Sequence, residues 1–470
     1  MYNKQNTSIS YGKMKNTTQL LLFVLLCCCF LPLSAQQEFT QQNTFTPIEK
    51  HLHSSAEPHI CGTAPMTQEE RRYTLDVVDK QGVDLRNMGT TCLPLRIHIV
   101  SRNDGSGGIS LDEINIGMSY LNAFYYDAAI EYYICSVNYI NSTAWYDFST
   151  SEESAMRGAH LVDDAINIFF VNSITTSSGG RACGYAYYPA NSDRSLTILM
   201  DNDCTAAWPN GTLVHELGHT FNLAHTHSGT ARGNTNSTAE HVPRSGANSN
   251  CTTDGDMLCD TPADPNGSND SNCNFVNDGN SQQDIYGNTY APAINNVMSY
   301  YSDACGGILT PDQYTRIANA LITRQGHSAY NLTGCGPTNV TNASNLTAAI
   351  SASYTVDLNW MDNANNETGY LIERSEDNGL TWKAVVGGGV APDVTTFVDD
   401  TAEGNRTYQY RVKASNDNCN DYSNVATINT GALYCIPSHQ SNSCTVFGTR
   451  GVAIYDFQMR ESGGGTTLIN

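Results

Sequence analysis

Two histidines four residues apart place the strongest constraint on how the middle of the chain can fold. His215 and His219 flank Glu216, and an α-helix places side chains four apart on one face. On that face the two imidazoles can share a tetrahedral cation, with the Glu216 carboxylate beside it. His225 can join them only if the helix ends after His219 and the chain turns back. The sequence therefore predicts a helix followed at once by a tight return.

This constellation matches the requirements of a catalytic zinc ion. Three imidazoles, from His215, His219 and His225, leave the fourth position of the metal open for water and substrate. Zinc lowers the pKa of that water, and Glu216 can take its proton and deliver it to a leaving amine. The alternatives are histidines on an ordinary amphipathic helix and a structural zinc site. A structural site has no use for a carboxylate beside its first ligand, so the pattern favours a zinc-dependent hydrolase.

The first 35 residues have the features of an export signal. Lys13 and Lys15 precede an apolar run over residues 20–33, which ends in a small-residue cleavage pattern. No later stretch is apolar enough to span a bilayer, so we expect a secreted protein that is not integral to a membrane. The formal net charge of -22 disfavours nucleic acid as a partner.

The pattern changes twice before the histidine motif. Residues 36–90 are polar, with basic sites at Arg71, Arg72 and Arg86, and are interpreted as a pro-segment or as a disordered spacer. Residues 91–335 alternate between strand and helix patterns, which predicts an α/β (α+β) catalytic domain with a twisted, mostly parallel sheet and an active-site helix. The expected strands are 95–100, 130–140, 165–171 and 196–200, and the expected helices are 111–129 and 312–325.

The remaining chain divides into three parts. Residues 226–295 form a polar stretch without periodicity, and a loop of that length needs disulfides or bound ions to hold it. Residues 337–430 are a series of short alternating segments that predicts an all-β sandwich, with strands at 356–360, 370–374, 382–386 and 408–414. Residues 431–470 are too short for a domain and are expected to be an incomplete β-rich tail.

The histidine motif resembles that of the metzincin metalloproteases, His-Glu-x-x-His-x-x-Gly-x-x-His. Asn222 stands where the family has glycine, and asparagine is the residue that best tolerates the same positive φ. Residues 296–300 resemble the Met-turn of that family. The resemblance implies that Met298 forms an apolar floor under the imidazoles and that the Tyr300 hydroxyl points at the metal or the oxyanion. Taken alone, Met298 would fit ordinary core packing.

Within the metzincins, residues 90–335 resemble the pappalysin family, especially members of the ulilysin and cytophagalysin type. The similar pieces are residues 255–262, 296–300, Cys305 and 310–313. The resemblance implies a disulfide between Cys273 and Cys305. It also implies a calcium ion near Asp254, Asp256, Asp260 and Thr261, although such a loop can simply be solvated. By the family spacing, His227 is an exposed or neighbouring residue and not a ligand.

The cysteine count leaves one thiol to explain. The chain has 16 cysteines, and removing the three in the apolar run with the signal leaves an odd number in a compartment where cysteines pair. Pappalysin-like zymogens hold a pro-segment cysteine on the zinc, and by that resemblance Cys61 is the candidate latch. The alternative is that Cys61 pairs with Cys92 and the odd thiol lies elsewhere.

Residues 337–430 resemble a fibronectin type III module through Trp360 and residues 408–414. Such modules act as spacers or make contact with surfaces or carbohydrate, and we assign this one no chemistry. The sequence thus predicts a secreted zinc endopeptidase, made as a zymogen, that acts on protein or peptide substrates. The alternative is an extracellular adhesion or carbohydrate-binding protein with a structural zinc site. A metallo-amidase on another scaffold would not explain His225 or the Met-turn.

Overall fold

The computed structural model describes most of the chain after residue 60. It covers residues 61–431 except 190–191, 208–210, 231–238, 277–282, 303–304, 306, 329–330, 334–338 and 352–354, and adds four short strands between 435 and 468. The predicted signal peptide, 1–35, and residues 36–60 of the predicted pro-segment lie outside the described residues. Among the described helices, none combines the length and the apolar character needed to cross a membrane.

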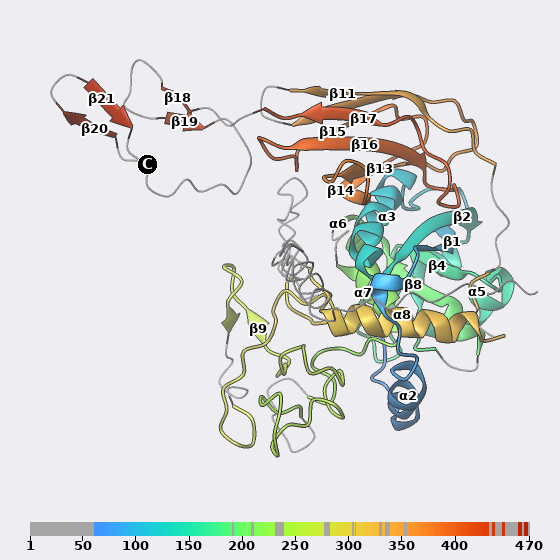
Figure 1. The fold of residues 1–470 in the computed structure, drawn as a ribbon. Coiled ribbons are helices and arrows are strands. Elements are labelled where there is room, and N and C mark those ends of the chain that lie inside the picture. Colours follow the sequence, from blue (N-terminus) through green and yellow to red (C-terminus); the bar gives the residue numbers. More distant parts are fainter. Residues whose placement is uncertain are drawn as a thin grey trace, which may run out of the picture. The chain divides into compact units, whose positions relative to one another are not determined.

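A five-stranded sheet forms the centre of the first domain (Figure 1). Its order is β2-β1-β4-β8-β7, and only β7 runs antiparallel to its neighbour. The strands are β1 (Thr91–Ser101), β2 (Ile130–Asn141), β4 (Ile166–Val171), β8 (Thr197–Asp201) and β7 (Gly184–Ala186). Every residue of β4 and β8 is buried, as is typical of parallel strands covered on both faces. The predicted mixed architecture with a mostly parallel sheet is confirmed.

Several elements differ from the sequence prediction. The expected helix at 111–129 ends earlier, because α3 (Leu111–Tyr125) passes into the 3-10 turn η4 (Tyr126–Ala128), and Ala129, with φ 56°, reverses the chain. The prediction also missed short elements that carry no periodic pattern. These are β3 (Asp147–Ser149), β5 (Ser173–Thr175), β6 (Arg181–Ala182), β7, α4 (Thr143–Tyr146), η5 (Thr150–Glu152), α5 (Glu153–His160), η6 (Asp193–Leu196) and α6 (Asn202–Ala207).

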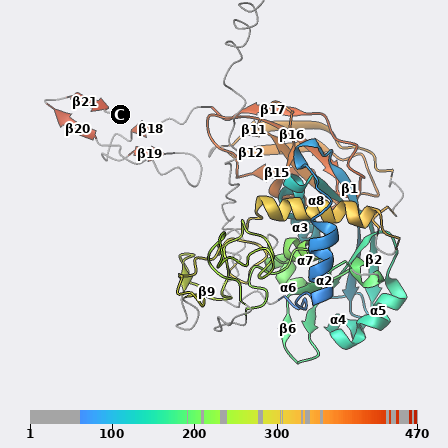
Figure 2. The same cartoon turned by 60° about the horizontal axis from the view of Figure 1, so that its bottom comes forward.

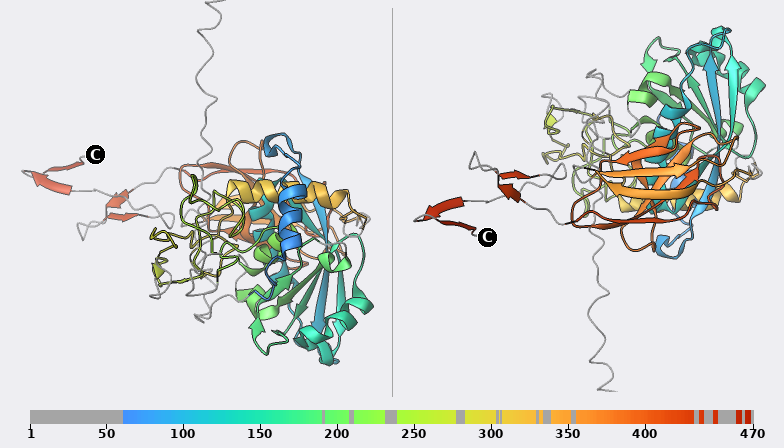
Figure 3. Two further views of the ribbon diagram at one scale, coloured as in Figure 1. Left: turned by 90° about the horizontal axis from the view of Figure 1, so that it is seen from below. Right: turned by 90° about the horizontal axis from the view of Figure 1, so that it is seen from above.

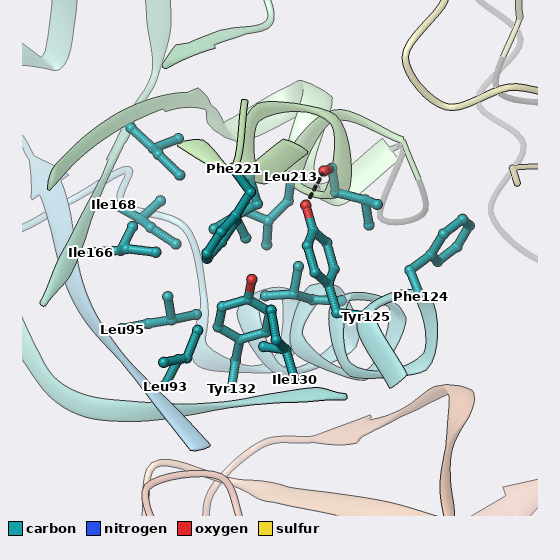
Figure 4. Packing of buried hydrophobic residues seen from close by; sticks show 14 of the residues in the cluster. Leu93, Leu95, Phe124, Tyr125, Ile130, Tyr132, Ile166, Ile168, Leu213 and Phe221 are labelled. Atoms are coloured by element: carbon teal, nitrogen blue, oxygen red, sulfur yellow. Dashed lines mark hydrogen bonds between the residues drawn. The ribbon is translucent and has the colours of Figure 1, made fainter. Parts of the chain in front are cut away.

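The main core lies between this sheet and the helices α3, α7 (Thr212–Thr220) and α8 (Pro311–Gln325). Figure 4 shows Tyr125 reaching from α3 to α7, where its hydroxyl donates a 3.1 Å hydrogen bond to the Val214 carbonyl. Tyr132 meets Tyr125 edge to face at 5.3 Å, and Leu213 and Phe221 pack into the same cluster. One side of α7 is thus fixed on the core, which leaves its histidine side free for chemistry.

Helix α8 supports the end of α7. Arg324 is fully buried, and its guanidinium donates to the carbonyls of Thr220, at 3.0 Å, and Ser195, at 3.2 Å. A cation near the last carbonyls of a helix is stabilising, because those groups carry partial negative charge and have no partner within the helix. Helix α8 starts at a capping box, in which the side chains of Thr310 and Gln313 each accept a hydrogen bond from the other residue's backbone amide.

Residues 61–90 are folded against this domain and are not a disordered spacer. They form α2 (Gln68–Tyr73), the π-helical turn η2 (Thr74–Val78) and the 3-10 turn η3 (Leu85–Asn87). Figure 2 shows α2, in blue, beside α8, in gold. Val78 is fully buried in the main core, and Asp79 forms a 2.8 Å ion pair with the buried Arg316 of α8.

Disulfides hold the long polar loop that precedes residues 296–300. In the part of this loop that the structure describes, the strands are the two-residue β9 (Ser268–Asn269) and β10 (Phe275–Val276). Disulfides join Cys251 to Cys259 and Cys273 to Cys305. Outside the loop, a further disulfide joins Cys183, between β6 and β7, to Cys204 of α6.

Residues 344–429 form a β-sandwich of two antiparallel sheets (Figure 3, orange and red strands). One sheet has the order β11-β12-β15 and the other β14-β13-β16-β17. Trp360, Tyr408 and Tyr410 are buried in the core between them. The strands are β11 (Ser344–Ile350), β12 (Val356–Met361), β13 (Tyr370–Ser375), β14 (Lys383–Val390), β15 (Thr396–Asp399), β16 (Thr407–Ala414) and β17 (Ala426–Asn429). Of these, β11, β15 and β17 were not predicted.

The sandwich is joined to the first domain by covalent and noncovalent contacts. Cys92, in β1, forms a disulfide with Cys419, β14 packs along α3, and Leu371 of β13 belongs to the main core. Lys413, almost fully buried, pairs with Glu131 of β2. In the tail, the structure describes the paired strands β18 (Cys435–Pro437) and β19 (Cys444–Val446), and β20 (Met459–Ser462) and β21 (Gly465–Leu468).

Candidate metal centre

Helix α7 presents His215 and His219 on the side away from the core. Leu213, Val214 and Leu217 of the same helix are buried in the main core, which fixes the rotation of the helix. Gly218 has a packing reason for being glycine, because a Cβ there would lie 2.6 Å from the Met298 sulfur. The small residue lets the floor of the site approach the helix closely.

The helix ends where the sequence requires it to end. Phe221 and Leu223 both donate their amides to the Gly218 carbonyl, each at 3.0 Å, which closes the last turn. Asn222 has φ 64°, in the left-handed region. Its side-chain amide donates to the Thr74 hydroxyl at 3.1 Å, so the return of the chain is also tied to residues 61–90. The reversal brings His225 back to the first two histidines.

The three histidines meet through one nitrogen each. The Nε2 atoms of His215, His219 and His225 form a triangle with all three edges at 3.1 Å, and all three side chains are buried. The Nδ1 atoms of His215 and His219 face the carbonyls of Val297, at 2.7 Å, and Leu223, at 2.8 Å. A carbonyl only accepts, so these Nδ1 atoms carry the protons and the Nε2 lone pairs point into the triangle.

This donor set fits zinc. Nitrogen lone pairs at such separation repel one another unless a cation lies between them. In a tetrahedral zinc site with bonds of about 2.0 Å, two ligand nitrogens lie about 3.3 Å apart, close to the observed edges. The carbonyl partners on Nδ1 are the kind of second interaction that orients metal-bound histidines.

Glu216 lies beside this triangle without belonging to it. Its side chain is fully buried, Oε2 accepts from the Thr63 hydroxyl at 3.1 Å, and Oε1 has no hydrogen-bond partner among the described residues. Burial raises the pKa of Glu216 to about 8. A cation bound to the histidines would act in the opposite direction and favour the carboxylate.

Cys61 lies on the open side of the histidine triangle. Its Sγ is 3.5 Å from His219 Nε2 and donates to Glu216 Oε2 at 3.5 Å. Together with His215 and His225, it forms a four-residue group whose ligand atoms lie within 4.8 Å of one another. Cys61 is a free thiol, because Cys92 pairs with Cys419. The alternative pairing of Cys61 with Cys92 is therefore wrong. Burial, and then the neighbouring Glu216, raise the pKa of the Cys61 thiol.

The segment that carries Cys61 lies along the edge strand β7. Gly62 donates its amide to the Gly184 carbonyl at 2.7 Å, and the Ala186 amide donates to the Thr63 hydroxyl at 2.9 Å. The segment thus uses the backbone groups that the end strand of the sheet leaves unpaired.

Residues 296–300 lie against the histidine helix and the site. Met298 is fully buried against Gly218. Tyr300 stands beside His225, with 4.8 Å between ring centroids, and its hydroxyl donates to the Cys61 carbonyl at 3.2 Å. His227 is buried and stacks on His225 at 5.0 Å, so the expectation of an exposed residue was wrong and that of a neighbour of the ligands holds.

Two residues of the site were not anticipated. Asp264 is buried and accepts from the hydroxyls of Thr226, Ser299 and Tyr301 at 2.6 to 2.9 Å. It ties the turn that follows the three histidines to the segment around residues 299–301. Thr63 bonds both Glu216 and β7. Neither residue belongs to a spaced motif, and the Asp264-Pro265 pair would at most have indicated a turn.

The residues predicted to bind calcium are dispersed. Among the described residues, Asp254, Asp256 and Asp260 are not one of the groups whose carboxylates converge. Asp260 caps α8, where it accepts from the Thr310 hydroxyl and the Asp312 amide. Asp256 is buried, accepts from the Thr261 hydroxyl at 2.8 Å and has one unpartnered oxygen, and burial raises its pKa to about 7. Calcium in this loop stays a prediction.

Comparison with known proteins points to peptide-bond hydrolysis. No protein-family model matches the chain. It is 27% identical to an extracellular metalloprotease of Podospora anserina over 47% of this chain and 70% of that protein. An extracellular metalloprotease of Colletotrichum graminicola is 24% identical over 55% of this chain and 87% of its own length. One from Pyricularia oryzae is 28% identical over 47% and 72%. These similarities support a secreted metalloprotease.

Solved structures match only a small part of the chain. An Fn3-like protein from Clostridium thermocellum aligns with 19% of this chain and 92% of its own, with 20% identity and a TM-score of 0.17. Domains from titin align with 20% of this chain and 33% of theirs, with 19% identity and the same score. Scores this low establish no shared fold.

Proposed function

We propose that the chain is a secreted zinc endopeptidase of the metzincin type, close to the pappalysins, and that it is made in a latent form closed by Cys61. The observation that carries the proposal is the triangle of Nε2 atoms with 3.1 Å edges beside the buried carboxylate of Glu216. A structural zinc site is closed by four protein ligands and has no use for a buried carboxylate beside them. The unpartnered Oε1 of Glu216 is instead available to a water molecule.

His215, His219 and His225 would hold the metal, and zinc in this position would activate water and polarise the scissile carbonyl. Glu216 would receive the proton from the water and pass it to the leaving amine, since its carboxylate is buried beside the histidines and contacts Cys61. The Tyr300 hydroxyl is a neutral donor whose pKa is raised by burial, so it can donate to the oxyanion without losing its proton.

The edge of β7 offers a place for the substrate backbone. An extended peptide can add to an exposed sheet edge through main-chain hydrogen bonds. Gly184 and Ala186 of β7 have backbone groups in position for this, and Gly62 and Thr63 already use them. We therefore expect the substrate to lie along β7 with its scissile bond over the histidines.

The same contacts support the proposed latent form. The segment from Cys61 to Thr63 engages Glu216, Tyr300 and the β7 edge at once. In this state the thiol can supply a fourth ligand to the zinc, which leaves no position for water. Removal of residues 61–79 would free the base, the oxyanion donor and the edge strand together.

A substitution of Glu216 tests the mechanism. Glu216→Gln keeps the shape of the side chain but cannot take a proton, so the processed variant should lose roughly 10²- to 10⁴-fold in peptide hydrolysis. Zinc content, measured by mass spectrometry of the metal, should stay at the wild-type value because the ligands are intact. Glu113→Gln, at the start of α3, is the matched control and should leave both values unchanged. A Glu216→Gln enzyme with full activity would refute the assignment.

A further inference from the structure

Three carboxylates gather in the sandwich, away from the histidine site. Asp362 and Glu367 come from the loop after β12, and Asp393 from the loop between β14 and β15. One carboxylate oxygen of each lies within 4.8 Å of the others. In the part of the chain that the structure describes, none of the three forms an ion pair with a lysine or an arginine. Like charges this close repel one another, so the group needs a compensating charge.

The state of Glu367 is the second and independent observation. Its side chain is only 8% exposed. Oε1 accepts from the Asp393 amide at 3.1 Å, whereas Oε2 is buried without a hydrogen-bond partner. A carboxylate oxygen that is removed from water and lacks a partner is costly, and proteins usually pair such a group or use it to bind a metal.

The remaining contacts of the group are with neutral donors. Asp362 accepts from the Ala364 amide at 2.9 Å and from the Tyr370 hydroxyl. Tyr370 is buried, and its pKa is raised by burial and then by the adjacent carboxylates. It therefore stays protonated and donates, but contributes no positive charge.

We propose that Asp362, Glu367 and Asp393 bind a calcium ion. Calcium takes six to eight oxygen ligands in flexible geometry and is commonly held by carboxylates on loops. Asp393 is exposed, so water can complete the coordination on that side. Magnesium is a poorer match, since it requires a near-ideal octahedron and gives up its water reluctantly. This site is separate from the one predicted in the 226–295 loop.

The position of the site gives the ion a structural task. The same two loops hold the sandwich against α3. Asn115 donates to the Thr368 carbonyl at 2.8 Å, and the Ala391 amide donates to Asp112 at 3.1 Å. Gly369 packs so closely that a Cβ would lie 2.2 Å from the Asn115 amide nitrogen. An ion that joins the loops fixes both halves of this contact.

The test is calcium titration of the full-length, zinc-loaded chain by calorimetry, after treatment with EGTA. Glu367→Gln and Asp393→Asn should each bind one calcium ion fewer than the wild type. Glu403→Gln, an exposed carboxylate of the same sandwich, is the matched control and should bind the wild-type number. Asp256→Asn tests the separate calcium site predicted in the 226–295 loop. This variant should still bind the calcium ion assigned to Asp362, Glu367 and Asp393.

Thermal unfolding gives a second test, because the difference in stability between the wild type and Glu367→Gln should change sign when calcium is added. In EGTA, Glu367→Gln should be as stable as the wild type or more so, because it removes a buried charge. In excess calcium the order should reverse, since only the wild type gains from the ion. Equal calcium stoichiometry in all variants, or equal stabilisation by magnesium, would overturn the proposal. If Glu367→Gln fails to fold, the exposed Asp393→Asn decides by the same loss of one ion.

Discussion

Residues 61–79 and the β-sandwich both pack on the catalytic domain, but they are attached by different means. The sandwich is joined by the Cys92–Cys419 disulfide and shares the main core through Leu371. The first segment has Cys61 as its one cysteine, and that thiol is free. It is held by hydrogen bonds, the Asp79–Arg316 ion pair and the buried Val78. We call residues 61–79 the first cover and the β-sandwich the second cover. Cleavage of the chain after the first cover can release it, whereas the disulfide keeps the second cover attached.

The largest expected effect on peptidase activity comes from removing the thiol of residues 61–79. Cys61→Ala should make the precursor active before any processing, because water gains access to the metal. We expect hydrolysis of a peptide substrate to rise roughly tenfold or more, which corresponds to about 1.4 kcal/mol or more. The double variant Cys61→Ala, Glu216→Gln is the control and should be inactive. Unchanged latency in Cys61→Ala would show that the thiol does not close the site.

Removing the disulfide tests the permanent attachment of the second cover. Cys92→Ser combined with Cys419→Ser should lower the free energy of unfolding by about 2 to 5 kcal/mol. Denaturant unfolding measures this change. Peptide hydrolysis by the processed enzyme should remain, since neither cysteine lies near the histidines. A variant as stable as the wild type would place the attachment in the noncovalent contacts instead.

A test of either attachment at low pH requires the pH dependence of the stability of the domain on which both parts pack. The buried His98 contributes to that dependence. His98 is buried, accepts from the side-chain amide of Asn138 on Nδ1 and donates from Nε2 to the side-chain oxygen Oδ1 of Asn167. Burial lowers its pKa to about 4. Between pH 6.5 and 4 the unfolded chain binds more protons than the folded one, so stability rises with pH across this window and is lost as pH falls.

The titration of His98 alone should lower the free energy of unfolding by roughly 3 kcal/mol between neutral pH and pH 4. Unfolding of the wild type and of His98→Gln, measured between pH 7 and 4, checks it. The neutral variant should lack this part of the slope, whatever its stability at pH 7. Parallel pH profiles for the two proteins would rule His98 out as the source.

The smallest effect on peptidase activity is expected from the ion pair between Asp79 and Arg316. Asp79→Asn removes the carboxylate that faces the buried Arg316, which should weaken the docking of residues 61–79 by about 1.5 to 3 kcal/mol. We expect a modest rise in the activity of the precursor and faster processing by trypsin, both smaller than with Cys61→Ala. Asp84→Asn, whose partner Arg86 is exposed, is the matched control. An effect of equal size in both variants would mean that the buried pair is not special.

The comparison also shows which parts of the molecule are encoded locally. Strands β4 and β8 are continuous apolar runs, and the histidine helix follows from spacing within eleven residues, so both could be predicted. Asn222 could be assigned a positive φ because few residues adopt one. Strand β7 is only three residues long and carries no pattern, although Cys61 lies beside it.

What could not be predicted depends on contacts between distant parts of the chain. Arg324 reaches Thr220 across 104 residues, and Thr63 reaches Glu216 across 153. The three carboxylates proposed to bind calcium, Asp362, Glu367 and Asp393, come from two loops, and none of them belongs to a spaced motif. From the sequence, charged side chains in polar stretches are predicted to be exposed to solvent, and only the folded structure shows which of them are buried.

Digestion of a mixed peptide library by the processed protein tests the central claim most directly. Released peptides would be identified by mass spectrometry with 1,10-phenanthroline, with its non-chelating 1,7 isomer, and after zinc is restored. We predict cleavage at internal peptide bonds that disappears with the chelator, persists with the isomer and returns with zinc. Cleavage that continues in the chelator, or that Glu216→Gln performs equally well, would contradict the account.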